Sequence, residues 1–328
     1  MPQVHTVTGP VDTARLGQVL MHEHLFVLDP EIQSNHPEEW GSESERVADA
    51  VARLRALAGT GVRTIVDPTV LGMGRYIPRI QEIAAQVDLN IIVATGYYTY
   101  DHLPFYFQYR GPALAAVVGR EVPDPMVDMF VRDIEHGIAD TGVRAGLLKC
   151  AIDHQGMTSD VERVLRAVAK AHRRTGAPIT VHTHPGSRQG SAVAEVLADE
   201  GVDPRRVVLG HSGDTTDIAH LSELADAGFL LGMDRFGIYL ETSFEARAGT
   251  VVEMCRRGYA GHMVLSHDAA CYYDAVPPEF APMFPAWHYT HIHEKVLPYL
   301  RQQGVTDEQI ETMLVANPRR YFENTAAY

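Results

Sequence analysis

The chain has 328 residues, a formal net charge of −14, 45% hydrophobic residues and 21% charged residues, values typical of a globular protein. Such an acidic surface repels phosphate groups, so we expect the protein to bind neither nucleic acid nor anionic membranes. No apolar run approaches the roughly 18–20 residues that span a bilayer. Three widely spaced cysteines and a start without a secretory signal favour a reducing cytoplasm.

Short apolar runs alternate with amphipathic segments along the chain, after a small hairpin expected around Gly9-Pro10. Eight of these runs are predicted strands, at residues 18–26, 63–68, 90–95, 145–151, 178–182, 206–211, 229–233 and 262–268. Helical periodicity lies between them and is clearest at residues 44–58, 161–175, 191–200 and 218–227. A long loop over residues 269–290 and a closing helix over residues 317–322 complete the prediction.

Continuous apolar strands that alternate with helices predict a parallel sheet covered by helices. Eight such units over this length predict one α/β domain, residues 1–328, folded as a (β/α)8 TIM barrel. A doubly wound open sheet is the main alternative. It is disfavoured because no glycine-rich phosphate turn follows the first strand, and the short run Gly72-Met73-Gly74 indicates only a loop.

Candidate functional residues lie where the predicted strands end, because the carboxyl-terminal face of such a barrel carries its chemistry. His22 and His24 are two residues apart at the end of the first strand, so their side chains are expected on one face. Four later strands end in further candidates: Lys149, His182, His211 and Asp268. A lone histidine at a strand end is usually a hydrogen-bonded core residue. Five strand ends that converge on one barrel mouth instead predict a metal site.

Lys149 is the unusual member of this set. Its neighbours Leu148 and Cys150 indicate a buried strand, and lysine is almost never buried without a partner. An ion pair with a nearby carboxylate is the simpler interpretation. The favoured alternative is chemical: burial depresses the lysine pKa, and a neutral amine can add carbon dioxide to form a carbamate that bridges two metal ions.

These stretches together resemble the binuclear amidohydrolase superfamily and, within it, the phosphotriesterase family. The resemblance spans the whole chain and lies in Leu20-Met21-His22-Glu23-His24-Leu25, Gly146-Leu147-Leu148-Lys149, Thr180-Val181-His182-Thr183-His184, Leu209-Gly210-His211-Ser212-Gly213-Asp214 and Leu265-Ser266-His267-Asp268. Two further stretches resemble the lactonase branch of the family: Thr95-Gly96-Tyr97-Tyr98-Thr99-Tyr100 and Met233-Asp234-Arg235-Phe236-Gly237.

The resemblance implies two divalent metal ions, zinc first and otherwise iron, cobalt or manganese, a range that imidazole and carboxylate ligands suit. The more buried ion would be held by His22, His24 and Asp268. The more exposed ion would be held by His182 and His211. Carbamylated Lys149 and a hydroxide would bridge the two ions.

Three residues are implied to have catalytic roles. Asp268 would pass a proton from the attacking hydroxide to the leaving group, Tyr98 would orient the substrate carbonyl or contact the hydroxide, and Arg235 would steady the substrate. The simpler alternatives are that Tyr98 is a pocket wall and that Arg235 pairs with Asp234 or another acid. Glu23 and His267 are expected to face away from the metals, and His184 to lie outside the ligand set.

A second histidine cluster, at His288, His291 and His293, has metal-like spacing, but packing or surface roles are the favoured interpretation. The loop over residues 269–290 is apolar and aromatic and is expected to form an acyl-chain channel. Related lactonases carry tryptophan where Ala275 aligns, which leaves the acyl-chain preference open. The aromatic run Phe105–Tyr109 predicts a dimer surface or, equally, core packing, and the family resemblance implies a homodimer.

The resemblance implies the predicted function: a quorum-quenching lactonase that opens N-acyl-homoserine lactones, with organophosphate triesters as weaker substrates. A specialised phosphotriesterase is the first alternative. A metal-dependent deoxyribonuclease is more remote, because that class typically has a carboxylate on the fourth strand and the charge of −14 disfavours DNA. A barrel that binds metals without catalysis is the third alternative, and the long apolar loop argues against it.

Overall fold

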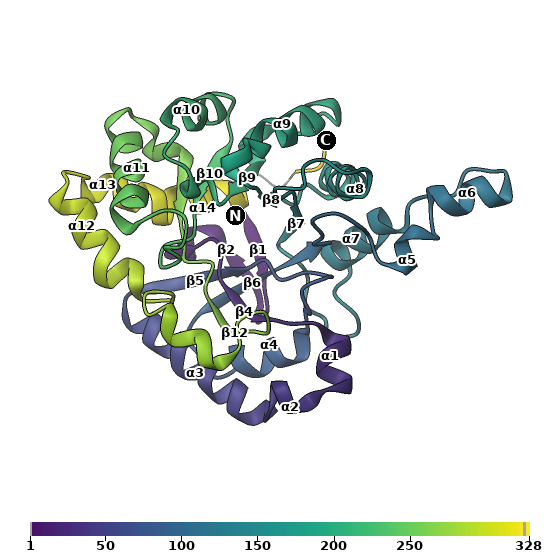
Figure 1. Cartoon of the computed structure of the whole chain (residues 1–328), viewed down its shortest axis with the longest axis horizontal. Helices are drawn as coiled ribbons and strands as arrows, with labels where there is room; N and C mark the ends of the chain where they lie inside the picture. The colour runs from purple at the N-terminus through teal and green to yellow at the C-terminus, as the bar shows by residue number, and fades with distance from the viewer. Residues whose placement is uncertain (1, 324–325) are drawn as a thin grey trace.

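The computed structural model describes residues 2–323 and 326–328 and places eight parallel strands side by side in a barrel (Figure 1). Their order follows the chain: β3 (Gln18–Leu20), β5 (Val62–Asp67), β6 (Asn90–Gly96), β7 (Leu147–Ala151), β8 (Ile179–His182), β9 (Val207–Gly210), β10 (Leu230–Met233) and β11 (Met263–Leu265). The Met21 amide donates to the Leu265 carbonyl at 3.4 Å, which joins the first strand to the last. The predicted (β/α)8 TIM barrel is confirmed.

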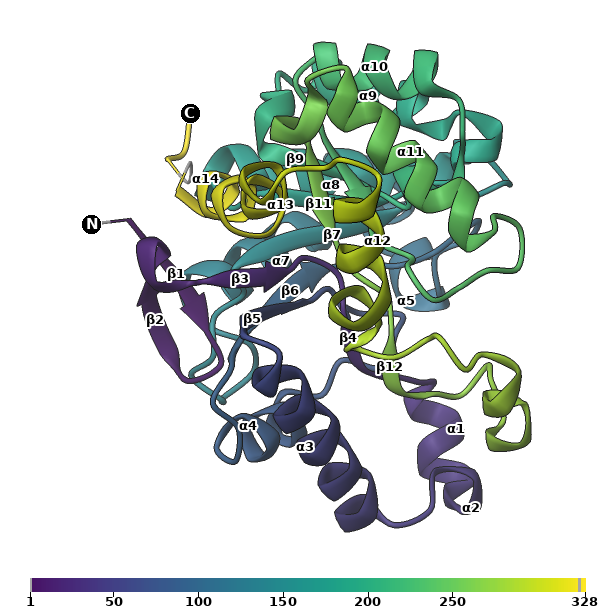
Figure 2. The ribbon, with the colours of Figure 1, turned by 90° about the vertical axis from the view of Figure 1, so that its left-hand side faces the viewer.

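Helices surround the barrel and connect successive strands (Figures 1 and 2). They are α1 (Pro30–Asn35), α2 (Pro37–Trp40), α3 (Glu43–Gly59), α4 (Ile77–Ala84), α5 (Phe105–Gln108), α6 (Pro112–Val118), α7 (Pro125–Glu135), α8 (Ser159–Thr175), α9 (Gln189–Asp199), α10 (Ile218–Asp226), α11 (Phe244–Arg256), α12 (Leu297–Gln302), α13 (Asp307–Glu311) and α14 (Asn317–Glu323). The hairpin of β1 (Gln3–Thr6) and β2 (Gly9–Asp12) packs at the amino-terminal end of the strands. Among the described helices, none is long and apolar enough to cross a membrane.

The first predicted strand is wrong as a continuous element. The structure divides it into β3 and a second strand, β4 (His24–Val27), with an irregular turn at residues 21–23. Val19 and Met21 belong to the cluster inside the barrel, so unbroken alternation would turn the next histidine outward. The break redirects the chain, because the His22 amide donates to Ser266 Oγ at 2.8 Å instead of continuing the ladder.

The eighth strand also ends earlier than predicted. β11 stops at Leu265, and Asp268 lies three residues beyond it with a left-handed backbone (φ +54°). The expected loop over residues 269–290 contains β12 (Ala270–Tyr273), which pairs in parallel with β4, and the 3-10 helix η6 (Pro278–Met283). The loop is therefore partly regular, and its paired start extends the wall of the barrel mouth.

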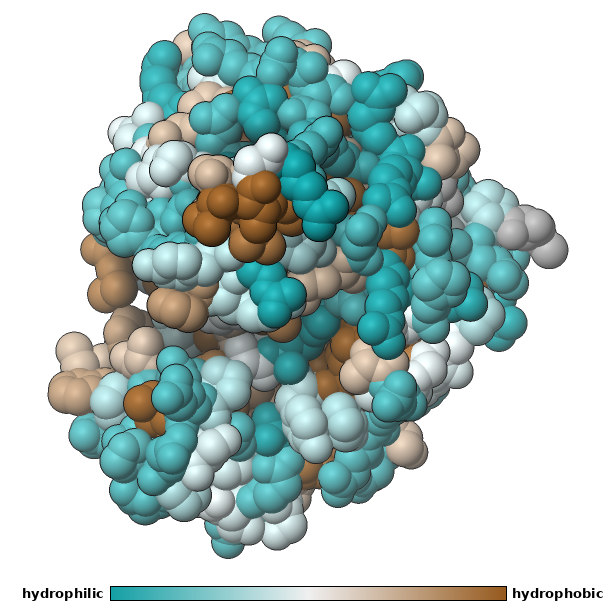
Figure 3. Space-filling model, turned by 90° about the vertical axis from the view of Figure 1, so that its right-hand side faces the viewer, coloured by the Kyte–Doolittle hydropathy of each residue, from teal (hydrophilic) through white to brown (hydrophobic). Residues whose placement is uncertain are grey.

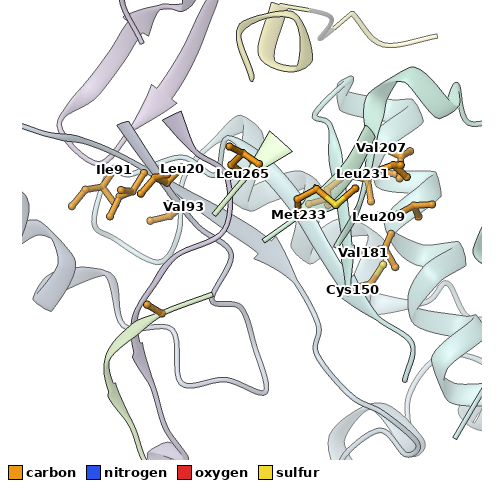
Figure 4. Close-up of a cluster of buried hydrophobic side chains, with 14 of the residues drawn as sticks. Leu20, Ile91, Val93, Cys150, Val181, Val207, Leu209, Leu231, Met233 and Leu265 are labelled. Atoms are coloured by element: carbon orange, nitrogen blue, oxygen red, sulfur yellow. The ribbon is translucent and has the colours of Figure 1, made fainter. Parts of the chain in front are cut away.

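Strand residues alternate between two apolar layers. Outward-facing side chains pack against the helices, and those labelled in Figure 4 are Leu20, Ile91, Val93, Cys150, Val181, Val207, Leu209, Leu231, Met233 and Leu265. Inward-facing side chains such as Val66, Ile92, Leu147 and Val208 fill the barrel interior. Lys149 has the same parity as Leu147, so its side chain enters the barrel above this apolar floor.

Candidate metal centre

All six predicted ligands converge on one cavity of about 510 Å³ at the carboxyl-terminal end of the barrel. They come from five places in the fold: His22 and His24 at the β3–β4 break, Lys149 on β7, His182 at the end of β8, His211 after β9 and Asp268 after β11. The side chains of the four histidines and Lys149 are almost fully buried. The barrel therefore brings together every residue selected from the strand ends.

Two groups of contacts divide this cluster. On one side, Asp268 Oδ1 lies 3.3 Å from both His22 Nε2 and His24 Nε2. On the other side, His211 Nε2 lies 2.8 Å from His182 Nδ1. Lys149 Nζ lies 3.5 Å from His22 Nε2. The inward atoms are thus three Nε2 atoms, one Nδ1 atom and a carboxylate oxygen, which are ligand types that suit zinc and related ions.

The outward nitrogens of three rings are held by acids that strand-end reasoning missed. Asp234 accepts from His22 Nδ1 at 2.9 Å through one oxygen and contacts His211 Nδ1 at 3.0 Å through the other. Thr69 Oγ1 lies 2.7 Å from His24 Nδ1 and donates to Asp67 Oδ1 at 2.5 Å. Both acids lie at strand ends, Asp67 on β5 and Asp234 after β10, so position alone could have drawn attention to them.

Burial and charge set the protonation of the cluster. Burial lowers the pKa of His182 to about 4 and lowers the pKa values of His22 and His211 as well, so these rings are neutral near pH 7. Burial also lowers the pKa of Lys149 to about 8, which makes a neutral amine accessible. His24 differs, because the hydrogen bonds that its ring donates to Asp268 and Asp67 outweigh its burial and raise its pKa to about 9.

Two of the clustered residues have an unfavourable backbone conformation. His211 and Asp268 have φ values of +64° and +54°, in the left-handed region that non-glycine residues rarely occupy. Such conformations cost on the order of 1 kcal/mol each and persist only where the surrounding structure enforces them. The hydrogen bond from the His211 amide to Asp234 (2.7 Å) and that from the Asp268 amide to the His22 carbonyl (3.0 Å) enforce them here.

Tyr98 and Arg235, the other predicted catalytic residues, both line the cavity. The Tyr98 hydroxyl lies 2.9 Å from His182 Nδ1, and burial raises its pKa, so it stays protonated. Arg235 donates from Nε to Asp268 Oδ2 at 3.0 Å and from a terminal nitrogen to Asp214 at 2.9 Å. Arg235 therefore forms ion pairs with two acids other than Asp234, so the simpler interpretation, an ion pair with an acid, agrees with the structure. The remaining walls are mostly apolar, and they include Leu28, Met73, Ile238, Leu240, Val276 and Phe284.

Glu23 and His267 lie outside the cluster, as expected. The fully buried Glu23 carboxylate accepts from Ser266 Oγ (2.8 Å) and from the amides of His267 (2.9 Å) and Ala269 (3.1 Å). It also contacts His267 Nδ1 at 2.6 Å. Glu23 follows β3, and its hydrogen bonds join this part of the chain to the segment after β11. They hold the first and last strands of the barrel together at their carboxyl-terminal ends.

The remaining histidines also lie apart from the cluster. His184 contacts Ser187 and lines a neighbouring cavity. The three histidines near the end of the long loop have separate partners: His288 contacts Thr290, His291 contacts Tyr239 and His293 contacts Gln18. Among the described residues they form no group that could hold a metal ion, so the packing interpretation of this cluster is favoured.

In the described part of the chain, two groups place ligand atoms within 4.8 Å of one another. One is His22, His24 and Asp268, and the other is His22, His211 and Asp234. The first group faces the cavity, whereas Asp234 sits behind the rings on their Nδ1 side with only 1% of its surface exposed. Asp234 is therefore better placed to orient the imidazoles than to bind an ion with them.

The barrel and the cluster at its mouth define a TIM-barrel protein with a candidate metal centre at the carboxyl-terminal ends of its strands. Residues 2–322 match the model of the phosphotriesterase family, and the chain belongs to this family, which is part of the amidohydrolase superfamily. A phosphotriesterase homology protein of Mycobacterium tuberculosis is 59% identical, with both chains fully covered. A solved structure described as the phosphotriesterase from Mycobacterium tuberculosis matches with a TM-score of 0.96 and 58% identity over all of both chains. An aryldialkylphosphatase of Saccharolobus solfataricus is 35% identical over 95% of this chain and 96% of its own length.

Proposed function

We propose that residues 1–328 form a single binuclear metal hydrolase domain that opens lactones, foremost N-acyl-homoserine lactones, and hydrolyses organophosphate triesters more slowly. The observation that best supports lactone hydrolysis is the cavity itself, which has a volume of about 510 Å³ and mostly apolar walls beyond the polar cluster. A lactone ring with an acyl chain would place its ester at the cluster and its chain along these walls. A compact phosphotriester would leave much of that apolar surface uncovered, which favours the lactone.

The ligand assignment follows the direction of the nitrogens. His22, His24 and Asp268 would hold one ion, because Asp268 Oδ1 faces the Nε2 atoms of both rings. His182 and His211 would hold the other, through the Nδ1 and Nε2 atoms that face each other. Zinc is the proposed metal, with iron, cobalt or manganese as substitutes that the same ligands accept.

Lys149 would bridge the two ions as a carbamate. Its side chain is 0% exposed, and among the described residues no carboxylate lies within the 4.0 Å of an ion pair, which weakens the simpler interpretation. The neutral amine would attack carbon dioxide, form an N–C bond and release one proton to solvent. The product is an anion with two oxygens, so the charge of the bridging group would change from repelling cations to binding them.

When bound, two divalent ions would supply Lewis acidity, which lowers the pKa of water and polarises the scissile carbonyl or phosphoryl oxygen. Asp268 would accept the proton of the attacking water and deliver it to the leaving alkoxide. Arg235 would hold the second oxygen of Asp268 in place, as the 3.0 Å contact between them supports. Tyr98 would donate its hydroxyl proton in a hydrogen bond to the lactone carbonyl, since burial keeps it protonated.

A specialised phosphotriesterase is the second candidate. It is favoured by one observation, the 35% identity to a chain named aryldialkylphosphatase. Both candidates use the same cluster, so they differ in which substrate the cavity walls favour.

We further propose a cytoplasmic homodimer, with α5 and α6 at its interface. These helices project from the barrel in Figure 1, and apolar side chains break the polar surface on that side in Figure 3. Phe105 is 75% exposed and Val117 is 82% exposed, and the segment from Phe105 to Val118 contains no acidic residue in a chain of net charge −14. Two copies could therefore bring these faces together without bringing carboxylates together.

The test is ring opening of an N-acyl-homoserine lactone by zinc-reconstituted protein, followed by the acid released at constant pH. Asp268→Asn removes the proposed proton carrier, and Asp140→Asn, an exposed acid remote from the cavity, is the matched control. We expect turnover by the wild type and the control and a loss of at least about 100-fold in Asp268→Asn. Equal rates in all three proteins, or no opening by any of them, would refute the proposal.

A further inference from the structure

Asp153 contacts the edge of His182 that faces away from the cavity. It lies two residues beyond the end of β7, and its carboxylate is 15% exposed. Asp153 Oδ2 lies 2.5 Å from His182 Nε2, and Oδ1 accepts from the His154 amide at 2.6 Å. His154 Nδ1 also contacts Oδ1 at 2.7 Å. The carboxylate is thus fixed at both oxygens, with one of them aimed at a single imidazole.

This contact completes a pattern around the four rings. Asp234 serves two of them, His22 and His211, which belong to different proposed metal positions. His24 is held through Thr69 and Asp67. Among the described residues, the Asp153 carboxylate contacts His182 and His154 and none of the other three rings.

The two nitrogens of the His182 ring have different roles: Nε2 contacts the carboxylate that orients the ring, and Nδ1 faces the proposed metal position. Nδ1 and Nε2 of an imidazole point in divergent directions, and His182 Nδ1 faces both His211 Nε2 (2.8 Å) and the Tyr98 hydroxyl (2.9 Å). Asp153 is on the Nε2 side, so it cannot share an ion with Nδ1. A carboxylate at Nε2 keeps the proton there and leaves the Nδ1 lone pair free, as outer partners of metal-bound histidines do.

Building on the proposed metal centre, we propose that Asp153 is a positioning residue that holds His182 with its Nδ1 toward the cavity and thereby controls retention of one of the two ions, at the His182–His211 position. Asp234 contacts one histidine of each position, so its removal weakens both. Asp153 also lines a neighbouring cavity of about 310 Å³, whereas Asp234 is almost fully buried. The carboxylate that supports the His182 ring is therefore more exposed than the one that supports His22 and His211.

The test is stepwise zinc binding by the full-length protein, measured by equilibrium dialysis at graded free zinc with the metal counted by mass spectrometry. Four variants are compared with the wild type: Asp153→Asn, Asp153→Ala, Asp234→Asn and the exposed control Asp140→Asn. For Asp153→Ala we expect one binding step to weaken by about 10–100-fold and the other to stay unchanged. Asp153→Asn should weaken the same step less, because its amide oxygen still accepts from Nε2.

The three acids differ in which zinc-binding steps their replacement should weaken. Asp234→Asn should weaken both steps, and Asp140→Asn neither. Thermal melting of the metal-free proteins separates misfolding from a loss of orientation, since Asp153→Asn should melt with the wild type. Two unchanged steps in Asp153→Ala, or two equally weakened steps, would overturn the role of Asp153. A wild type that binds fewer than two ions per chain would instead overturn the proposed binuclear function.

Discussion

Replacing Lys149 with alanine removes the side chain that is proposed to contact both metal positions. The ammonium group is completely buried, 3.5 Å from His22 Nε2 and 6.0 Å from the centre of the Tyr98 ring. Loss of an outer partner of a metal ligand typically costs about 10–100-fold in metal affinity. Because the carbamate would bind both ions directly, we take the upper figure as a minimum for each, about 2.8 kcal/mol.

The assay follows zinc content and lactone turnover in Lys149→Ala across a range of free zinc. At limiting zinc we expect kcat/KM to fall by at least about 100-fold, in step with metal loss. Acetate or propionate fits the vacated space and offers the missing carboxylate, so either anion should restore part of the metal content and activity. The matched control is Lys170→Ala, an exposed lysine on α8 that should behave as the wild type.

Lys149→Ala with wild-type zinc content and turnover, and without any response to added carboxylate, would refute the carbamate. A direct check uses the wild type with 13C-labelled bicarbonate. If Lys149 carries the carbamate, we expect a carbamate carbon resonance that disappears in Lys149→Ala and remains in Lys170→Ala.

Three further predictions concern protons, stability and assembly. The pKa of His24 is raised to about 9, so this ring is protonated at pH 7 in the metal-free protein. Zinc binding should release that proton, and zinc affinity should rise as the pH rises toward 9. A calorimetric binding enthalpy that does not depend on the ionisation enthalpy of the buffer would contradict this. Glu23→Ala leaves the donors of Ser266, His267 and Ala269 unpaired and should destabilise the metal-free protein by about 3–5 kcal/mol, whereas an unchanged melting temperature would argue against the closing role. Val117→Asp should give monomers in sedimentation experiments, and an unaltered dimer would move the interface elsewhere.

Periodicity was sufficient to predict the barrel and the convergence of its strand ends. Apolar runs of the right length predict Lys149 on β7 and His182 on β8, and the apolar neighbours of Lys149 predict its burial. Local pattern could not predict the β3–β4 break, because the break depends on Ser266 and Glu23, which are far apart in sequence and hydrogen bond across the barrel mouth. At the break, the His22 amide donates to the Ser266 side chain instead of to a backbone carbonyl of a neighbouring strand. A pattern read over a short stretch of sequence cannot include both of these residues.

The acids behind the histidine rings were missed for a related reason. The strand-end pattern indicates groups that could face a metal, and the sequence suggests Asp234 only as a partner of its neighbour Arg235. Which nitrogen of a ring points inward depends on tertiary packing, so the contacts of Asp234 with His22 and His211 appear only in the folded chain. Its place next to the end of β10 was the available signal.

The shape of the cavity decides which ester the site hydrolyses fastest. The direct measurement is kcat/KM for a medium-chain N-acyl-homoserine lactone and for an aryl dialkyl phosphate, with one zinc-loaded preparation of the protein. We expect a ratio that favours the lactone by orders of magnitude, because the acyl chain covers apolar walls such as Leu28 and Phe284 that a compact phosphotriester leaves open. A ratio that favours the phosphate would contradict the account and make phosphotriester hydrolysis the main activity of this site.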